Sequence, residues 1–412
     1  MDKKQINHYM KRDHLAEIRR AAQTLEGVIK TTPLIRSDYY SGEYGCDVFI
    51  KPEQLQVTGS FKIRGAYNKI ASLDEKERAN GVIASSAGNH AQGVALSARM
   101  MNCPATIVMP SITPLLKVNA TKAYGADVIL HGDVYDESYN KAIALAEQND
   151  FTFVHPFDDY EVICGQGTIA LEILAELPDA DEILVPIGGG GLIGGIALAA
   201  KAVNPKIKII GVIPKGARSM KISLEEGRVS RLAEVKTAAE GVAVKQPGDL
   251  TFAIAQQYVD GIETVSEKDI MESILLIIEK HKFIAETAGV VPIAGLKKRA
   301  KGGKKIVCVM SGGNIDTVTL SSIINQGMIS RGRIMCFSVE LPDRPGQLVA
   351  VATLLANLGA NVIELEHNQF KALDRYSDKV ALEVTVETNG PDHIREVLGE
   401  LEGEGYAVSR IY

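Results

Sequence analysis

The chain has 412 residues and a formal net charge of −6, with 46% hydrophobic and 23% charged residues. These proportions are ordinary for a globular protein and argue against a disordered or fibrous chain. The mild negative charge argues against nucleic acid or an anionic membrane surface as a partner. Because single cores rarely grow beyond about 250 to 300 residues, we expect more than one domain.

Cysteine usage and the N-terminus indicate a cytoplasmic protein. The five cysteines are widely spaced and contain no C-x-x-C pair, which argues against a disulfide frame or a zinc site. The eight histidines show no metal-binding spacing, so we expect no metal. The first residues are polar and no apolar run reaches about 18 residues, so we predict neither a secretion signal nor a membrane span. A small-molecule partner is the simplest expectation.

The first 325 residues alternate short β-branched runs with helical stretches. An amphipathic helix is predicted at 15–30, before the first strand. Strands are predicted at 47–51, 81–85, 105–109, 127–131, 182–187, 208–213 and 305–310. This alternation predicts an α/β fold with parallel sheets covered by helices.

The pattern changes after residue 325. Residues 326–332 are polar and contain glycine, so they are predicted to be a linker. From residue 333 to 412 the expected order is strand, helix, strand, strand, helix, strand. That order predicts a ferredoxin-like α+β domain.

Three loops rich in glycine or serine follow predicted parallel strands. The first consists of Gly188, Gly189, Gly190, Gly191 and Leu192 at a helix start, where free N–H groups suit a phosphate. The second contains Ser86, Ala87, Gly88, Asn89 and His90, which suit a carboxylate, although Ser86 is equally well explained as an ordinary helix cap. The third is Ser311-Gly312-Gly313-Asn314. Carboxyl ends of parallel strands share one edge, so we expect the three loops to face one crevice.

The glycine loop also matches G-x-G-x-x-G, a pattern typical of dinucleotide sites. No acid stands where the next strand ends, at residues 212–215, so NAD is disfavoured. Lys62, in the stretch QVTGSFKIRGAYNK, would by itself be interpreted as a solvated cation. A phosphate-binding loop, a carboxylate-binding loop and a lysine are, however, the groups that pyridoxal phosphate requires. We expect Arg64 and Lys69 to remain ordinary solvated cations.

The motifs GSFKIRGA, SSAGNHAQGVA, GQGTIALEI, GGGGLIGG and SGGN occur in this order between residues 15 and 325. They closely resemble the fold type II pyridoxal-phosphate enzymes of the threonine and serine dehydratase group. The resemblance implies a tryptophan synthase beta-like fold over 1–325, with two parallel-sheet subdomains. It implies that Lys62 binds the cofactor and acts as the catalytic base, and that the substrate carboxylate meets Ser86, Ala87, Asn89 and His90. The other cofactor contacts that it implies are Phe61, Asn89, Gly188, Gly189, Gly190, Gly191, Leu192, Glu286 and Ser311.

The same resemblance implies β-elimination of L-threonine to 2-oxobutanoate and ammonia, and of L-serine to pyruvate. A neutral Ser311 at the pyridine nitrogen leaves the ring largely unprotonated, which favours elimination over a long-lived carbanion. Serine racemases of similar sequence carry a serine in place of Ala87, so a dehydratase is favoured over a racemase. Their acidic metal ligands correspond to Ile213 and Ser219 here, so no divalent metal is expected.

Residues 333–412 contain FSVELPDRPGQL and GANVIELEHNQ and resemble a single ACT domain, an amino-acid-sensing module. The resemblance implies an amino-acid or nucleotide effector and a homodimer or homotetramer, although a purely dimerising module stays possible. Both isoleucine biosynthesis and threonine catabolism fit. The alternatives are a serine racemase or serine dehydratase, a β-replacing enzyme similar to threonine synthase, and a non-catalytic amino-acid sensor.

Overall fold

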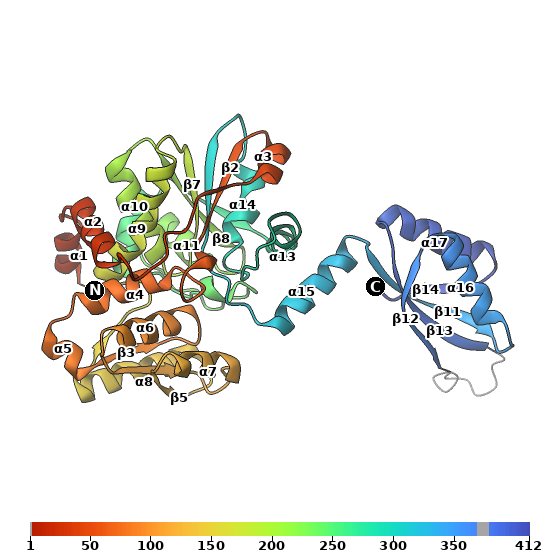
Figure 1. The fold of residues 1–412 in the computed structure, drawn as a ribbon, viewed down its shortest axis with the longest axis horizontal. Coiled ribbons are helices and arrows are strands. Elements are labelled where there is room, and N and C mark those ends of the chain that lie inside the picture. Colours follow the sequence, from red (N-terminus) through yellow and green to blue (C-terminus); the bar gives the residue numbers. More distant parts are fainter. Residues whose placement is uncertain (1, 369–378) are drawn as a thin grey trace. The chain divides into compact units, whose positions relative to one another are not determined.

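The computed structural model of the chain describes residues 2–368 and 379–412. The chain divides into two compact units, and the boundary falls between Ile315 and Asp316, ten residues before the predicted boundary at 325 (Figure 1). None of the helices in the described residues combines the length and hydropathy needed to cross a bilayer. The motif GANVIELEHNQ ends at Gln369, outside the described residues.

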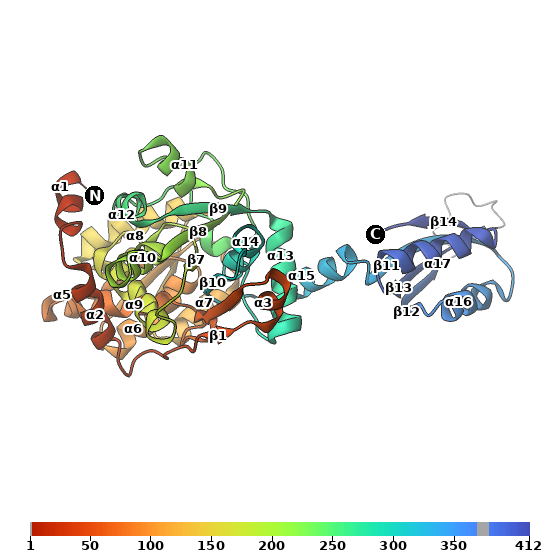
Figure 2. The ribbon, with the colours of Figure 1, turned by 90° about the horizontal axis from the view of Figure 1, so that it is seen from above.

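The first unit is built on a six-stranded sheet. Its strand order is β1-β2-β10-β7-β8-β9, and every neighbouring pair is parallel except β1 with β2 (Figure 2). The strands are β1 (Ile35–Arg36), β2 (Asp47–Pro52), β7 (Glu182–Pro186), β8 (Lys208–Pro214), β9 (Gly261–Val265) and β10 (Lys305–Met310). All five residues of β7 are buried, as expected for a parallel strand with both faces covered.

A second, four-stranded parallel sheet has the order β5-β4-β3-β6. Its strands are β3 (Val82–Ser85), β4 (Ala105–Met109), β5 (Asp127–Leu130) and β6 (Thr152–Phe153). Each sheet packs in its own apolar core. The predicted α/β fold with two parallel sheets is therefore confirmed, and the predicted strands match observed ones. Sequence patterns missed β1, β6 and β9.

Three helices of this unit pack closely on one another, with the second in contact with both others: α4 (Lys62–Ala71), α9 (Tyr160–Glu176) and α10 (Gly191–Val203). A Cβ atom on Gly165 would lie 2.6 Å from the Cα atom of Gly65, and one on Gly167 would lie 2.8 Å from the carbonyl oxygen of Gly195. The glycines of the motif GQGTIALEI therefore let α9 contact the backbones of both neighbours. This packing holds α4, and with it Lys62 at its first residue.

The other helices of this unit pack on the sheets or on neighbouring helices. A helix was predicted at 15–30, but the observed helix α2 is shorter and ends at Thr24. The helices are α1 (Lys3–Tyr9), α2 (His14–Thr24), α3 (Asp38–Tyr44), α5 (Glu75–Asn80), α6 (Asn89–Met100), α7 (Leu115–Ala123), α8 (Tyr135–Asn149), α11 (Ser219–Glu226), α12 (Asp249–Tyr258), α13 (Glu267–Leu276) and α14 (Val291–Arg299), with short helical turns at Glu53–Leu55, Glu240–Val242 and Ile277–His281.

The second unit begins with α15 (Thr317–Ser330), followed by β11 (Ile334–Pro342), α16 (Gln347–Asn357), β12 (Asn361–Asn368), β13 (Lys379–Glu387), α17 (Pro391–Gly403) and β14 (Ala407–Arg410). The four strands form an antiparallel sheet in the order β12-β13-β11-β14, and apolar residues of α16 and α17 pack on it. The predicted order of elements is thereby confirmed. Most of the predicted linker, 326–332, belongs to the last turns of α15 rather than to a loop.

Candidate active site

Lys62 lies where the loop before α4 meets the loop after β10. Ser60 and Gly312 form an isolated antiparallel bridge. The backbone N–H of Phe61 donates to the Ser311 carbonyl oxygen at 3.1 Å, and that of Gly313 donates to the Gly59 carbonyl oxygen at 2.9 Å. Backbone hydrogen bonds therefore place Ser311 next to Phe61 and Lys62.

The loop after β3 joins this pair of loops through side-chain amides. The Asn314 Nδ2 atom donates to the Thr58 carbonyl oxygen at 2.7 Å and to Asn89 Oδ1 at 2.8 Å. The Asn89 Nδ2 atom donates to Glu286 Oε1 at 2.7 Å. Although β3 and β10 belong to different sheets, the loops that follow them are in direct contact.

The amine of Lys62 is held in an environment that disfavours its charged form. Its Nζ atom donates to the Pro156 carbonyl oxygen at 2.7 Å and lies 5.3 Å from the centre of the Phe61 ring. Burial lowers the pKa of Lys62 to about 8, and the negative charge of Glu286 opposes this shift. A neutral amine is what a nucleophile or a general base needs, and it is accessible here near neutral pH.

Glu286 is perturbed in the opposite sense. Burial raises the pKa of its carboxyl group to about 7, and the hydrogen bond from Asn89 is the largest influence that opposes the rise. The protonation of Lys62 and that of Glu286 therefore both change within about one pH unit of neutrality.

The start of α6 presents free backbone donors. Gly88 N–H donates to Ser86 Oγ at 3.2 Å, whereas the N–H groups of Ala87, Asn89 and His90 have no acceptor within the part of the chain that the structure describes. The imidazole of His90 is turned away, with Nε2 bound to the Val154 carbonyl oxygen at 2.8 Å. Burial lowers the pKa of His90 to about 3, so the ring is neutral. These donors at a helix start suit a carboxylate.

The glycine loop between β7 and α10 is a second set of free donors. No backbone N–H from Gly188 to Leu192 donates to an acceptor in residues 2–368 or 379–412, and Gly189 to Leu192 are buried. Gly190 has a φ of 99°, and a Cβ atom there would lie 2.6 Å from Met220 Cε. Buried N–H groups are rarely left unpaired, so four in succession indicate an anion-binding site.

Sequence reasoning missed the segment that connects Lys62 to the glycine loop. Pro156 supplies the carbonyl oxygen that binds Lys62, and a Cβ atom on Gly191 would lie 2.9 Å from Cα of Phe157. The His155 Nδ1 atom accepts from the N–H of Asp158 at 2.8 Å and holds the turn. The only signal was the position of these residues directly after the two-residue strand β6, and no strand was predicted there.

The expectation that Arg64 is solvated was wrong. Its guanidinium is fully buried and binds both carboxylate oxygens of Glu53, at 2.7 and 2.8 Å, and those of Glu172, at 2.6 and 3.0 Å. Lys51 adds a second buried cation 2.6 Å from Glu172. Two cations and two anions balance in charge, and the cluster ties α4 to β2 and α9. Lys69 is also paired, 2.9 Å from Asp159.

These groups fit pyridoxal phosphate. The unpaired N–H groups of the glycine loop match its phosphate, and the Lys62 amine matches its aldehyde. The Asn89 amide and Ser311, which lie beside Lys62 through the contacts above, match the polar atoms of the ring. Within the described residues, no group of three or more His, Cys, Asp or Glu side chains is placed to hold a metal ion.

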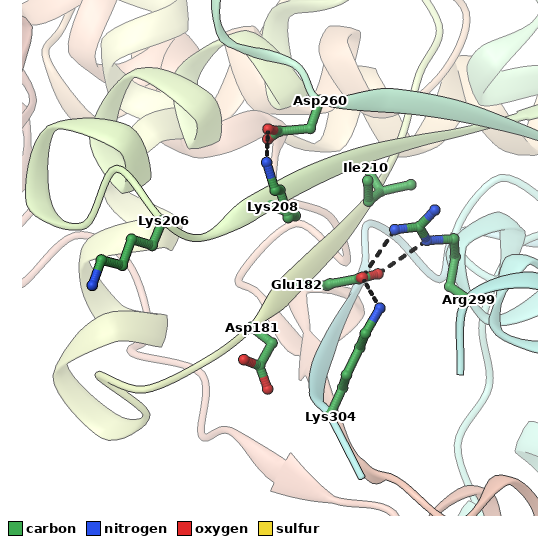
Figure 3. Close-up of a pocket in the computed structure, with 8 residues that line it drawn as sticks. All are labelled: Asp181, Glu182, Lys206, Lys208, Ile210, Asp260, Arg299 and Lys304. Atoms are coloured by element: carbon green, nitrogen blue, oxygen red, sulfur yellow. Dashed lines mark hydrogen bonds and ion pairs between the residues drawn. The ribbon is translucent and has the colours of Figure 1, made fainter. Parts of the chain in front are cut away.

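A different cavity, of about 440 Å³, opens at the opposite, amino-terminal edge of the six-stranded sheet (Figure 3). The Glu182 carboxylate there accepts from Arg299 at 2.9 and 3.0 Å and from Lys304 at 2.6 Å. Asp260 lies 2.9 Å from Lys208. The Glu182 and Asp260 carboxylates that line this cavity are therefore already paired, unlike the backbone N–H donors at the carboxyl edge of the sheet. The lining residues are Asp181, Glu182, Lys206, Lys208, Ile210, Asp260, Arg299 and Lys304.

Comparisons with known proteins agree with the cofactor that the site fits. The family model described as "Pyridoxal-phosphate dependent enzyme" matches residues 25–312. An L-threonine ammonia-lyase of Thermotoga maritima is 46% identical over 395 residues, which cover 96% of this chain and 98% of that protein.

Solved structures give the same grouping. The processed form of threonine deaminase isoform 2 from Solanum lycopersicum is similar with a TM-score of 0.74 and 40% identity, over 80% of this chain and 90% of that one. Maize serine racemase is similar with a TM-score of 0.72 and 34% identity, over 77% and 98% of the two chains. The chain therefore belongs to the family of pyridoxal-phosphate dependent enzymes, and within it to the group of threonine ammonia-lyases.

Proposed function

We propose that the protein eliminates the β-hydroxyl group of L-threonine to yield 2-oxobutanoate and ammonia, and that it converts L-serine to pyruvate. The observation that carries the proposal is the Lys62 amine, with its lowered pKa, beside two sets of unpaired backbone donors. The similarity to an L-threonine ammonia-lyase along nearly the whole chain supports the choice of substrate.

We propose that the cofactor is held by groups already described. Pyridoxal phosphate, when bound, supplies an electron sink for the charge left on the substrate Cα atom. The N–H groups of Gly188 to Leu192 bind the phosphate, and the Asn89 amide binds a ring oxygen. With the cofactor bound, Phe61 would pack beside the ring, Ser311 would meet the pyridine nitrogen and Glu286 would lie near the ring. The contact of Ser311 with Phe61 supports these roles.

In the proposed reaction Lys62 moves a proton. The N–H groups of Ala87, Asn89 and His90, together with Ser86, bind the substrate carboxylate and orient its Cα–H bond. The neutral amine of Lys62 takes the Cα proton, and the β-hydroxyl leaves with one added proton as water, so the proton gained by Lys62 balances the one that the leaving water carries away. The enamine that is released then takes up water and yields the 2-oxo acid and ammonia. Overall the reaction is L-threonine to 2-oxobutanoate and ammonium, with no net oxidation.

The side chain of residue 87 supports elimination over racemisation. A racemase needs a second acid or base on the opposite face of the Cα atom, and Ala87 offers only a methyl group in the carboxylate-binding loop. Similarity to maize serine racemase keeps racemisation as the second candidate. Chiral analysis of the serine that remains after incubation tests it, because a racemase would form D-serine from L-serine.

We further propose that residues 333–412 are an ACT domain that regulates residues 1–325 through 326–332. The observed order of strands and helices supports this proposal. Its effector would be an amino acid or a nucleotide, and the protein a cytoplasmic homodimer or homotetramer. A role in isoleucine biosynthesis or in threonine catabolism follows from which effector acts.

The experiment that tests the proposal measures cofactor and product together. Purified protein should show a yellow absorbance with pyridoxal phosphate that is absent in Lys62→Ala, and should form 2-oxobutanoate from L-threonine. The rates of 2-oxobutanoate formation from L-threonine and of pyruvate formation from L-serine measure the substrate preference. The same two rates with and without isoleucine, valine, AMP or ADP measure regulation. A wild-type protein that stays colourless with added cofactor would instead indicate a non-catalytic sensor. Activity only with a phosphorylated or acylated substrate would indicate a β-replacing enzyme.

A further inference from the structure

Asn314 is the only side chain described above that bonds to both the loop before Lys62 and the loop after β3. Its Nδ2 atom donates to the Thr58 carbonyl oxygen and to Asn89 Oδ1. We propose that Asn314 is a positioning residue that holds the Asn89 amide with its N–H₂ group toward Glu286 and the cofactor. The proposal rests on the proposed function, because it concerns how the same site binds pyridoxal phosphate.

The direction of this hydrogen-bond chain follows from its two ends. The Thr58 carbonyl oxygen can only accept, so Asn314 must turn its Nδ2 atom toward it. The same Nδ2 atom contacts Asn89, so Asn89 must present Oδ1 to Asn314. The Nδ2 atom of Asn89 is then directed to Glu286. One hydrogen of that N–H₂ group binds the carboxylate, and the second stays available for a ring oxygen of the cofactor.

The backbone around Asn314 supports a fixed side chain. Gly59 has a φ of 70°, and a Cβ atom there would lie 3.0 Å from Asn314 Cγ, so only glycine leaves room for the amide. The Gly313 N–H group donates to the Gly59 carbonyl oxygen at 2.9 Å, which ties the two loops together on either side of the amide. The glycine before Lys62 therefore serves Asn314 as well as the turn.

Aspartate at position 314 has the same shape as asparagine, but it reverses the order of donors and acceptors along the hydrogen-bond chain. A carboxylate would face the Thr58 carbonyl oxygen with lone pairs, and would draw the Asn89 N–H₂ group toward itself. Asn89 would then direct Oδ1 toward Glu286 and the cofactor oxygen, where two acceptors repel. Alanine at position 314 would only release Asn89. Asn314→Asp should therefore weaken binding of the cofactor more than Asn314→Ala does.

The experiment measures binding of pyridoxal phosphate to the cofactor-free full-length protein by absorbance titration, with thermal unfolding of the same samples. The expected result is a dissociation constant raised about fivefold to tenfold in Asn314→Ala and by more than about tenfold in Asn314→Asp. Asn68→Ala is the matched control, because Asn68 lies in α4, the helix that begins at Lys62, and its amide likewise donates to a carbonyl oxygen, that of Glu161, at 2.8 Å. It should lower thermal stability by a similar amount and leave the dissociation constant within twofold.

A double-mutant cycle separates positioning from general damage. If Asn314 acts through Asn89, Asn314→Ala in an Asn89→Ala background should change the dissociation constant by less than about twofold. Fully additive effects, an unchanged dissociation constant in both Asn314 variants, or an equal effect of Asn68→Ala would overturn the inference. Failure of the wild-type protein to bind pyridoxal phosphate would overturn the proposed function instead.

Discussion

The two edges of the six-stranded sheet differ in whether their polar groups have partners within the described residues. At the amino edge Glu182 binds Arg299 and Lys304, and Asp260 binds Lys208, around a cavity of about 440 Å³. At the carboxyl edge the N–H groups of Gly188 to Leu192 have no acceptor in the described residues. Among the described residues, the hydrogen-bond acceptor of the Lys62 amine there is a neutral carbonyl oxygen.

The comparison teaches that unmet hydrogen-bonding capacity marks this active site better than empty volume does. A paired charge has already gained its electrostatic stabilisation within the protein, and a ligand that binds it must first break that pair. Unpaired buried donors cost free energy until a ligand arrives, so a ligand gains the full benefit of meeting them. The following predictions test the behaviour of one edge or of both.

Replacing the two lysines should give the largest contrast. Lys62→Ala removes the proposed covalent anchor and base, so kcat for L-threonine should fall about 10³-fold or more. Lys304→Ala removes a cation that only pairs with Glu182, and kcat should stay within about twofold. Steady-state assays of both purified variants decide the matter. Comparable losses in the two variants would contradict the contrast between the edges.

Substitution within the glycine loop should weaken cofactor binding strongly. Gly190→Ala forces a side chain onto a φ of 99° and toward Met220 Cε, so the loop must move and its N–H groups lose alignment. We expect the dissociation constant of pyridoxal phosphate to rise more than about tenfold.

Gly302→Ala is the control for backbone strain alone. Gly302 has a φ of 74° with nothing within 4 Å of a Cβ atom. Both variants should lose about 1 kcal/mol or more of unfolding free energy. If Gly302→Ala also raised the dissociation constant of pyridoxal phosphate, backbone strain rather than loss of the N–H donors would explain the result.

At the amino edge, Glu182→Gln should change stability and leave activity unaltered. The Arg299 and Lys304 side chains hold the pKa of Glu182 below its usual value of 4.5, against the effect of burial. A depressed folded-state pKa stabilises the protein above pH 4.5, and the contribution is lost as the pH falls through the folded-state value.

The loss in Glu182→Gln should be about 1 kcal/mol at pH 7, since both cations are partly solvated. Urea unfolding at pH 7 and again near pH 3.5 measures it, and the difference from wild type should shrink at the lower pH. A variant with normal stability but reduced kcat would contradict the structural interpretation of this edge.

The smallest expected effect concerns pH. Because burial lowers the pKa of Lys62 to about 8, the rate at which the cofactor-free protein captures pyridoxal phosphate should rise as the pH passes through 8 and level off above it. Glu286 raises that pKa, so Glu286→Gln should move the midpoint to lower pH. Stopped-flow absorbance measures both profiles. A midpoint that stays in place, or moves upward, would contradict the coupling of Lys62 to Glu286.

Regular strands and glycine-rich loops were predictable because their signals are local. The runs at 105–109 and 305–310 coincide with β4 and β10, and the loops after β3, β7 and β10 begin where those strands end. In the second unit a helical apolar pattern extended through Gly327 despite the cost of glycine in a helix, so part of the expected linker is helical.

Other features depend on partners distant in sequence. The burial of Arg64 could not be seen because Glu53 and Glu172 stand 11 and 108 positions away. Pro156 contributes a backbone carbonyl oxygen, which any residue possesses and no side-chain pattern reveals. Asn314 was visible as part of SGGN, but its bonds to Thr58 and Asn89 required the fold.

The position of β10 has a consequence for how the protein is made. This last strand of the first unit lies between β2 and β7, so the sheet is divided until residues 305–310 have been synthesised. A nascent chain that ends earlier holds Lys62 and the glycine loop but has no strand to join β2 to β7. Folding must therefore close contacts over some 250 residues, which is slow for so non-local a topology. Cofactor capture consequently reports that nearly the whole unit has been translated and folded.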